Sequence, residues 1–495
     1  MSVYLSKSQY CSAVQCPKML WLRKKRPELF DDSVMDEHIL ATGNSVGDLA
    51  MGLFGPFTEV PHGDLSGMIE ATRRLIDAGE TNIAEASFSY QGLFCSVDIL
   101  RNLGNGSVEI YEVKSSTSIR DIYYHDVAYQ NYVLTMLGFQ VEKVCLVHIN
   151  SEYVRGKELD IHQLFITEDL TECARSMSAE VGKTIAFLGS YLSADEEPAQ
   201  ELGEQCFTPY DCGFWGHCSE HLPSPNIFTV SGMQLKKKVE HYRKGLVSFP
   251  ELDRAGNLNA KQAQQIEHEI RGLPPELDKK MISLFLGELE YPLYFLDFES
   301  FQPAVPLYEN SRPYEQIVFQ YSLHYIEAEG APLKHTEYLA WPGEDPRRKL
   351  AEQLCKDIPM GVTTLAYNMS FEKGRIKALA QLYPDLAEHL MNIYDSMLDL
   401  MQPFQKRWFY CRDMQGSYSI KYVLPALFPG DPELDYHNLE GVHNGAEASA
   451  VFEAMADMPQ EQLLEYREHL LKYCGLDTLA MVKVWEKLGE VADPL

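Results

Sequence analysis

The chain has 495 residues, of which 45% are apolar and 23% charged, and its formal net charge is −29. This composition is typical of a folded protein and excludes a collagen, a coiled coil and a wholly disordered chain. At about 150 residues per domain, the length predicts two or three domains. The acidic excess excludes a protein that coats DNA through a spread basic surface, but not an enzyme that draws nucleic acid into a narrow groove.

The sequence also bears on location. Its apolar runs are short and interrupted by charge, and none approaches the roughly 20 residues that a membrane helix needs. The first residues lack the apolar segment of a secretory signal. We therefore expect a cytoplasmic protein with no membrane partner, whose 11 cysteines are reduced thiols and not disulfides.

Hydrophobic periodicity predicts an α/β fold for the first section, residues 1–225. Residues 108–114 alternate as a strand, 121–137 have helical spacing, and 143–149 form a buried strand. The stretch 166–193 is predicted to be one long helix. Residues 226–288 are polar, carry a Pro-Pro pair and are interpreted as a helical connector.

A second domain is expected over residues 289–495, beginning with an apolar strand. Strands followed by helices that cover them indicate a second α/β domain. The predicted strands are 291–296, 317–325 and 362–367, and the predicted helices are 346–357, 371–382, 445–456 and 460–488.

A first candidate site comes from two neighbouring strands joined by a Gly-Asn-Gly turn. Asp98 lies on one strand, and alternation puts Glu112 and Lys114 on one face of the next. Two carboxylates can bind a divalent cation, and a lysine can orient water or stabilise charge on a phosphate. This is the equipment of phosphodiester hydrolysis, although the same pattern also occurs in ordinary surface ion pairs.

These residues resemble the PD-(D/E)XK nucleases, and specifically their RecB-like branch. The resemblance implies a nuclease domain over 1–225, with Glu85 and Gln130 in supporting positions. The family's early histidine ligand is missing from this sequence, and either His38 or Asp48 can stand in for it.

Three cysteines, Cys206, Cys212 and Cys218, lie six residues apart in a loop-like stretch, and Cys16 lies far from them in sequence. Four thiolates suit a [4Fe–4S] cluster or zinc, but structural zinc sites favour close Cys-x-x-Cys pairs, which are absent here. The arrangement resembles RecB-like nucleases related to AddB and to CRISPR-associated nucleases. That resemblance implies a [4Fe–4S] cluster that fastens the first helix to the end of the domain.

A second candidate site combines acidic residues and a tyrosine from three parts of the C-terminal domain. Asp297 and Glu299 point to one side of a strand, and Glu372 opens a helix. Tyr473 and Asp477 stack on one face of a later helix. Each pair alone is a common pattern.

Together and in this order, these residues resemble the tyrosine branch of the DEDD exonucleases, which have a ribonuclease-H-like fold. Glu372 replaces the family's usual aspartate, and Asp395 is placed like a supporting acid. The resemblance implies that Asp297, Glu299, Glu372 and Asp477 bind Mg²⁺ or Mn²⁺ and that Tyr473 orients the attacking water.

The whole layout therefore predicts a nuclease with two metal sites that cleaves single-stranded nucleic acid. DNA is favoured and RNA is an alternative substrate, and the C-terminal domain is expected to act as a 3′–5′ exonuclease. The competing hypothesis is a nucleic-acid-binding or scaffold protein in which one or both sites are degenerate. The missing histidine and Glu372 are the features that favour this alternative.

Overall fold

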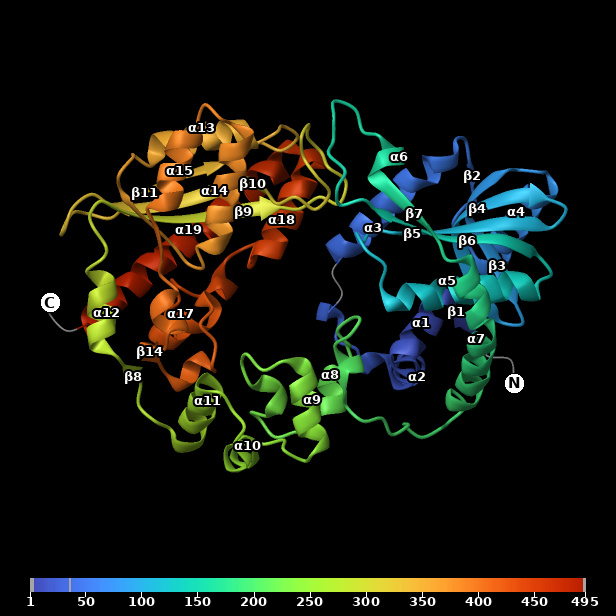
Figure 1. Ribbon diagram of the computed structural model, residues 1–495, viewed down its shortest axis with the longest axis horizontal. Coiled ribbons are helices and arrows are strands. Elements are labelled where there is room, and N and C mark those ends of the chain that lie inside the picture. Colours follow the sequence, from blue (N-terminus) through green and yellow to red (C-terminus); the bar gives the residue numbers. More distant parts are fainter. Residues whose placement is uncertain (1–3, 35–36, 493–495) are drawn as a thin grey trace. The chain divides into compact units, whose positions relative to one another are not determined.

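The computed structural model describes residues 4–34 and 37–492. The chain divides into two compact units (Figure 1). The first comprises Met1–Leu222 with Pro303–Glu315, and the second comprises Pro223–Gln302 with Gln316–Leu495. Both combine helices with a central sheet, so the predicted α/β class is confirmed. Among the described residues, no helix is both long and apolar enough to span a membrane.

The first unit is built on a seven-stranded sheet in the order β2-β3-β4-β5-β6-β7, with β1 pairing in parallel with β4. The pairs β3–β4, β4–β5 and β6–β7 are antiparallel, whereas β2–β3 and β5–β6 run parallel. The strands are β1 (Leu5–Ser6), β2 (Thr58–Glu59), β3 (Asn82–Tyr90), β4 (Leu93–Gly104), β5 (Ser107–Lys114), β6 (Gln140–Ile149) and β7 (Phe165–Asp169).

The predicted strand–helix–strand unit is confirmed as β5, α5 (Asp121–Met136) and β6. The turn between β4 and β5 has positive φ angles at Asn105 (53°) and Gly106 (80°), as a tight hairpin turn requires. The prediction of one helix over 166–193 is wrong at its start, because β7 occupies Phe165–Asp169 and pairs with β6. Helix α7 (Thr171–Tyr191) follows, and the Asp169 carboxylate accepts from the amide of Thr171 at 2.9 Å.

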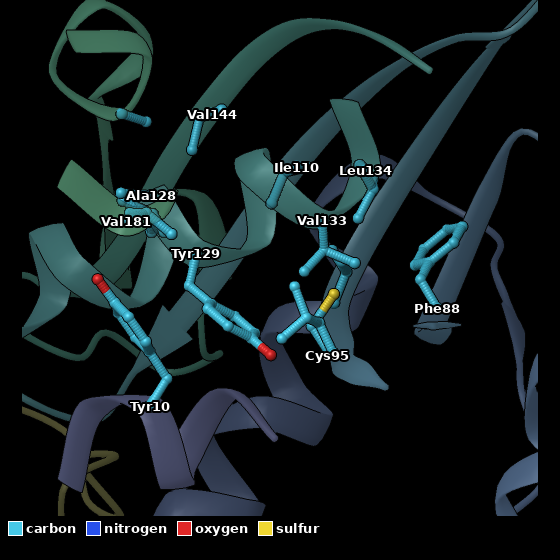
Figure 2. Close-up of a cluster of buried hydrophobic side chains, with 14 of the residues drawn as sticks. Tyr10, Phe88, Cys95, Ile110, Ala128, Tyr129, Val133, Leu134, Val144 and Val181 are labelled. Atoms are coloured by element: carbon cyan, nitrogen blue, oxygen red, sulfur yellow. The ribbon is translucent and has the colours of Figure 1, made fainter. Parts of the chain in front are cut away.

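Helix α1 (Lys7–Gln15) is held against α5 by a buried aromatic pair. The rings of Tyr10 and Tyr129 stack with their centres 4.8 Å apart (Figure 2). The Tyr129 hydroxyl donates to the carbonyl of Leu5 at 2.7 Å. These contacts fix the start of α1 relative to the sheet. The remaining helices of this unit are α2 (Pro17–Lys25), α3 (Glu37–Ala50), α4 (Leu65–Asp77), α6 (Ile161–Leu164) and α8 (Trp215–Ser219).

The first unit also contains Pro303–Glu315, which is distant from it in sequence. The backbone amide of Arg155 donates to the carbonyl of Ser311 at 3.0 Å, and its guanidinium donates to the carbonyl of Pro306 at 2.7 Å. Ala304 is buried in the same hydrophobic cluster as Val113. This segment is therefore part of the core that supports β5.

The second unit is built on a five-stranded sheet in the order β11-β10-β9-β12-β13. Strands β9 to β11 are antiparallel neighbours, whereas β12 is parallel to both β9 and β13. The strands are β9 (Leu293–Phe301), β10 (Ile317–Ile326), β11 (Lys334–Leu339), β12 (Thr363–Ala366) and β13 (Met397–Asp399).

The predicted helices of this unit are present as α13 (Arg347–Asp357), α14 (Ser370–Leu382), α18 (Gly445–Ala454) and α19 (Gln460–Val491). The sequence did not predict β11, β13, α15 (Ala387–Asp395), α16 (Gln402–Gln405) or α17 (Ile420–Leu427). These elements are short or lack a strong period.

The predicted connector is helical but belongs to the second unit. Its short strand β8 (Glu276–Leu277) pairs with β14 (Phe409–Tyr410), and the Gln265 side chain donates to the carbonyl of Gln415 at 2.9 Å. Its helices are α9 (Leu235–Arg243), α10 (Phe249–Ala255), α11 (Ala260–Arg271) and α12 (Lys279–Leu286).

Candidate active sites

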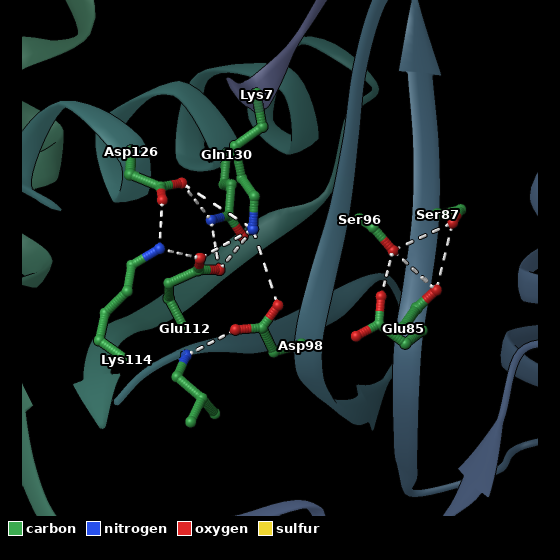
Figure 3. A network of polar contacts seen from close by, with 10 residues as sticks. Lys7, Glu85, Ser87, Ser96, Asp98, Glu112, Lys114, Asp126 and Gln130 are labelled. Atoms are coloured by element: carbon green, nitrogen blue, oxygen red, sulfur yellow. Dashed lines mark hydrogen bonds and ion pairs between the residues drawn. The ribbon is translucent and has the colours of Figure 1, made fainter. Parts of the chain in front are cut away.

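The first site forms across the β4–β5 hairpin, as the sequence predicts (Figure 3). The register sets Ile99 opposite Tyr111, which makes Asp98 and Glu112 neighbours on adjacent strands. The Lys114 ammonium donates to Glu112 Oε1 at 2.6 Å. Asp98 Oδ2 accepts from the backbone amide of Val113 at 2.7 Å, so this carboxylate is fixed by the neighbouring strand.

Two members of this site were missed by the sequence analysis. Lys7, on α1, donates to both carboxylate oxygens of Glu112 at 2.8 and 2.9 Å, and its ammonium lies 3.6 Å from Asp98 Oδ1. Asp126, on α5, accepts from Lys114 at 2.7 Å. Asp126 precedes Gln130 by one helical turn, and this spacing is the sequence signal that could have placed it in the site. No local pattern marks Lys7.

Of the two predicted supporting residues, Gln130 joins the site. Its amide nitrogen donates to Glu112 Oε2 at 2.7 Å and to Asp126 Oδ1 at 2.9 Å. Glu85 lies on β3 between Ala84 and Ala86, which pair with Ile99 and Val97, but its φ is 55° and its carboxylate accepts from the Ser96 hydroxyl. Figure 3 shows Glu85 apart from the network around Glu112.

The missing histidine ligand finds no replacement in the described contacts. Asp48 is exposed on α3, and among the described residues no hydrogen bond or ion pair links it to Asp98 or Glu112. The side chain of His38 lies outside the described residues.

The charged side chains of this site lie close together. Burial, together with the nearby Asp126 and Asp98, raises the pKa of Glu112 to about 7 against the opposing effect of both lysines. Burial alone would also raise the pKa of Asp126, but Lys114 and Lys7 hold it well below its usual range. The Lys7 ammonium lies between Asp98 and Glu112. This donor set of carboxylate oxygens fits a divalent cation.

The four predicted cysteines line one small cavity, together with Leu22 and Phe214. Burial raises the pKa of the Cys206, Cys212 and Cys218 thiols, and each is also influenced by Cys16. Among the described residues, no three cysteine sulfurs lie within 4.8 Å of one another. The four thiols therefore share a cavity without forming a close group of three.

The second site begins on β9, where Asp297 and Glu299 project to the same side. Together with Cys474 they offer ligand atoms that all lie within 4.8 Å of one another, the one such group found among the described residues. The Cys474 thiol, on α19, lies 3.9 Å from Asp297 Oδ2. Strand β9 and helix α19 thus supply the two halves of this centre.

Glu372 and Asp477 complete a set of four acids. Burial raises the pKa of Asp297 and Glu299 well above the usual range, and repulsion from Asp477 and Glu372 adds to the effect. Burial likewise raises the pKa of Glu372 to about 8 and of Asp477 to about 7. Glu372 Oε2 is buried without a hydrogen-bond partner. An orphaned carboxylate oxygen among other acids fits a cation that the acids would share.

Two tyrosines lie beside Asp477. Tyr473 precedes it by one helical turn and lowers its pKa against the effect of burial. The hydroxyl of Tyr436, which the sequence did not indicate, donates to Asp477 Oδ1 at 2.6 Å. Both tyrosines and Asp477 line a cavity of about 470 Å³. Its other walls come from α17 and from residues 428–437, including His437.

Asp399 takes the place beside Glu372 that the sequence analysis gave to Asp395. Asp395 is exposed at the end of α15, and no hydrogen bond or ion pair among the described residues joins it to the four acids. Asp399, at the end of β13, accepts from the amides of Asn368 and Met401 at 2.9 and 3.0 Å, and its charge contributes to the raised pKa of Glu372. The two acids are four residues apart, and the sequence held no signal that separates them.

These pKa shifts predict a pH-dependent stability of the metal-free second unit. Glu372 and Asp477 release their protons at a higher pH when folded than when unfolded, so the folded state binds more protons. The contribution of these two acids to the free energy of unfolding should therefore be fully present below about pH 4 and should be lost as the pH rises through 7 to 8. Because cation binding needs ionised carboxylates, Mn²⁺ at 100 times its Kd should raise Tm by roughly 5–10 °C at pH 8 and hardly at all at pH 5.

Thermal unfolding with EDTA or Mn²⁺ at both pH values tests this, with Asp297→Asn as the matched variant. The variant should lose most of the Mn²⁺ effect on the second unit. An equal Mn²⁺ shift in the variant would contradict a cation site at these acids.

Comparisons with known proteins add relatives but no chemistry. Residues 294–419 match a family model described as a domain of unknown function, DUF2779, and this stretch includes Asp297, Glu299 and Glu372. The chain is 27% identical over 227 residues to Uncharacterized protein UU173 of Ureaplasma parvum serovar 3, which covers 41% of the chain and 32% of that relative. It is 25% identical over 217 residues to Uncharacterized protein MG366 of Mycoplasma genitalium, which covers 40% of the chain and 32% of the relative. The chain thus aligns with about a third of the length of these relatives. Since neither name carries an activity, function has to be inferred from the geometry of the two sites.

Proposed function

We propose that the protein is a divalent-metal-dependent nuclease that cleaves single-stranded nucleic acid, preferentially DNA, at two separate sites. The observation that carries this proposal is a set of four acids in the second unit, of which Glu299 and Glu372 are buried and Asp297 and Asp477 are half-buried. Burial without a counter-charge is costly for carboxylates, and a bound cation removes that cost.

The second unit is proposed to act as a 3′–5′ exonuclease. Cations bound by the four acids would activate water and stabilise the leaving oxygen of a phosphodiester. The Tyr473 hydroxyl orients the water, and Tyr436 holds the Asp477 carboxylate in place through its 2.6 Å hydrogen bond. The adjoining cavity of about 470 Å³ offers space for a terminal nucleotide. The sheet supports this reading, because three antiparallel strands followed by two parallel ones are expected of a ribonuclease-H-like domain.

The first unit is proposed to be a RecB-like nuclease domain. Asp98 and Glu112 would bind the cation, which lowers the pKa of bound water. Lys114 is fixed by Glu112 and Asp126 at 2.6 and 2.7 Å, which positions its ammonium to stabilise charge on the phosphate. Lys7 balances the acids in the metal-free protein.

We also propose a [4Fe–4S] cluster at the four cysteines. The four thiols share one cavity, which supports a common metal site. The six-residue intervals between Cys206, Cys212 and Cys218, in place of close Cys-x-x-Cys pairs, favour the cluster over zinc.

Replacing Cys212 by serine tests the cluster. Protein prepared without oxygen should be brown and contain iron and sulfide, and Cys212→Ser should bleach it and lower the Tm of the first unit, because cluster binding is coupled to folding. Cys173→Ser, in α7 of the same unit, should keep both colour and Tm. A colourless protein with stoichiometric zinc would overturn the assignment.

The nuclease proposal is tested with 5′-labelled single-stranded DNA and RNA, incubated with Mg²⁺, Mn²⁺ or EDTA. The wild-type protein should cleave only with metal, and the double variant Asp98→Asn/Asp297→Asn should be inactive. Activity that persists in the double variant would show that the cleavage does not come from these sites. Binding without cleavage would favour the scaffold alternative, which the replacement of the usual aspartate by Glu372 keeps open.

A further inference from the structure

Three tyrosines and an arginine gather beside the first site, and the nuclease chemistry does not use them. The Lys114 ammonium lies 5.3 Å from the centre of the Tyr123 ring. Burial raises the pKa of Tyr210, and the neighbouring Tyr123 raises it further. The Arg120 guanidinium carbon lies 5.9 Å from the centre of the Tyr210 ring. These contacts form a continuous path from the lysine of the site to an exposed aromatic ring.

Tyr210 is 51% exposed, although it lies in a loop that is firmly held. The loop carries Cys206 and Cys212, and the side-chain amide of Gln15 donates to the carbonyls of Gln205 and Tyr210 at 2.8 and 2.7 Å. Gln15 ends α1, the same helix that begins with Lys7. An exposed ring on such an anchored loop is already ordered before any ligand binds, which lowers the entropy cost of binding.

The third tyrosine comes from the Pro303–Glu315 segment. The Tyr314 hydroxyl donates to the carbonyl of Ser115, the residue that follows Lys114. Burial raises the pKa of Tyr314, and the nearby Tyr123 and Arg120 also influence it. The tyrosine ring is therefore tied to the end of β5, beside the same site.

We propose that Tyr210, Arg120 and Tyr314 form a stacking platform that binds a single-stranded nucleic acid beside Asp98, Glu112 and Lys114. The inference rests on the proposed nuclease function and adds how the first site selects an unpaired strand. Tyrosine rings stack on bases of any sequence, and a guanidinium stacks on bases or pairs with phosphates. Tyr123 is buried between Lys114 and Tyr210 and acts as a positioning residue for the exposed ring.

Charge and exposure favour a single strand as the occupant. Arg120 is exposed, and in the described part of the chain no carboxylate pairs with its guanidinium. The unit as a whole is acidic, so a platform that relied on phosphate contacts alone would bind weakly. Stacking does not depend on net charge, but the bases of a duplex are not available for it.

Binding is measured separately from cleavage, by fluorescence anisotropy of labelled 20-nucleotide single-stranded DNA, the same RNA sequence and the DNA duplex, in EDTA. Wild-type protein should bind the single strands more tightly than the duplex. Tyr210→Ala should weaken single-strand binding by about 5- to 150-fold, the effect of losing one stacked base. Tyr210→Phe keeps the ring and should stay within about threefold of wild type.

Phe187→Ala is the matched control, because Phe187 is 50% exposed on α7 of the same unit. It should leave binding unchanged. Iron content and Tm of Tyr210→Ala should equal those of wild type, which separates loss of the ring from damage to the cysteine loop.

If Tyr210→Ala binds single strands as tightly as wild type, or if wild type prefers the duplex, the platform is refuted. If single-strand binding depends on Tyr210 but the protein does not cleave with any of the metals, the nuclease proposal is refuted and the platform is retained. A preference for DNA or RNA in the same titrations identifies which strand the platform takes.

Discussion

Replacing Asp297 by asparagine is expected to abolish the trimming of a free 3′ end. Asp297 contributes to the closest group of ligand atoms found in the described part of the chain and is electrostatically coupled to Glu299, Glu372 and Asp477. Loss of its charge weakens cation binding at the point where the acids converge. The loss should reach about a thousandfold or more, which corresponds to about 4 kcal/mol in the barrier.

Tyr473→Phe should be milder, at roughly ten- to a thousandfold, because it removes a hydrogen bond and leaves the four acids in place. Asp395→Asn and Asp399→Asn form a matched pair. The exposed Asp395 should be dispensable, whereas Asp399, beside Glu372, should not. Equal activity of these two variants would contradict the assignment of Asp399.

The substrate for this test is a single strand labelled at its 5′ end, used once with a free 3′ hydroxyl and once with a blocked 3′ end. The protein carries Lys114→Met, so that only the second site remains active. A ladder of products from the free strand that disappears on blocking is the expected result. Equal cleavage of the blocked strand would show that the second site does not enter from a 3′ end.

Lys114→Met should abolish cleavage by the first site while the second site keeps trimming. The Lys114 ammonium is held by Glu112 and Asp126, and it is the group proposed to stabilise charge on the phosphate. Its loss should lower cleavage of a 3′-blocked strand by about a hundred- to a thousandfold, the effect of removing one oxyanion-stabilising group. The substitution also removes a positive charge from beside the buried Glu112 and Asp126, which should lower the free energy of unfolding by about 3–5 kcal/mol.

Lys183→Met is the control for Lys114→Met. Lys183 is exposed on α7, and the substitution changes the net charge equally. Activity on both strands should be unchanged. Lys114→Arg keeps the charge and should recover most of the stability but little of the rate, because the guanidinium does not fit between the two carboxylates. If Lys114→Met stopped trimming of the free 3′ end as well, the two sites would not be independent.

The parts of both sites that lie within one local pattern were readable from the sequence. Alternation along β5 and the Gly-Asn-Gly turn put Glu112 and Lys114 beside Asp98, since a hairpin register follows from its turn. The one-turn spacing on α19 gave Tyr473 and Asp477. Asp126 lies one turn before Gln130, so the same spacing rule could have placed it in the first site.

Other features depended on contacts between residues far apart in the chain. Lys7 reaches Glu112 because Tyr10 and Tyr129 pack α1 onto α5, and Tyr436 reaches Asp477 through a segment without a regular period. Asp399 and Asp395 are equivalent in sequence, but only Asp399 ends a strand next to β12. Local periodicity fixes which way a side chain points within its own strand or helix. Which elements then meet is decided by burial of their apolar faces, and this is why the counter-ion Lys7, the acid Asp399 and Tyr314 emerge only in the tertiary structure.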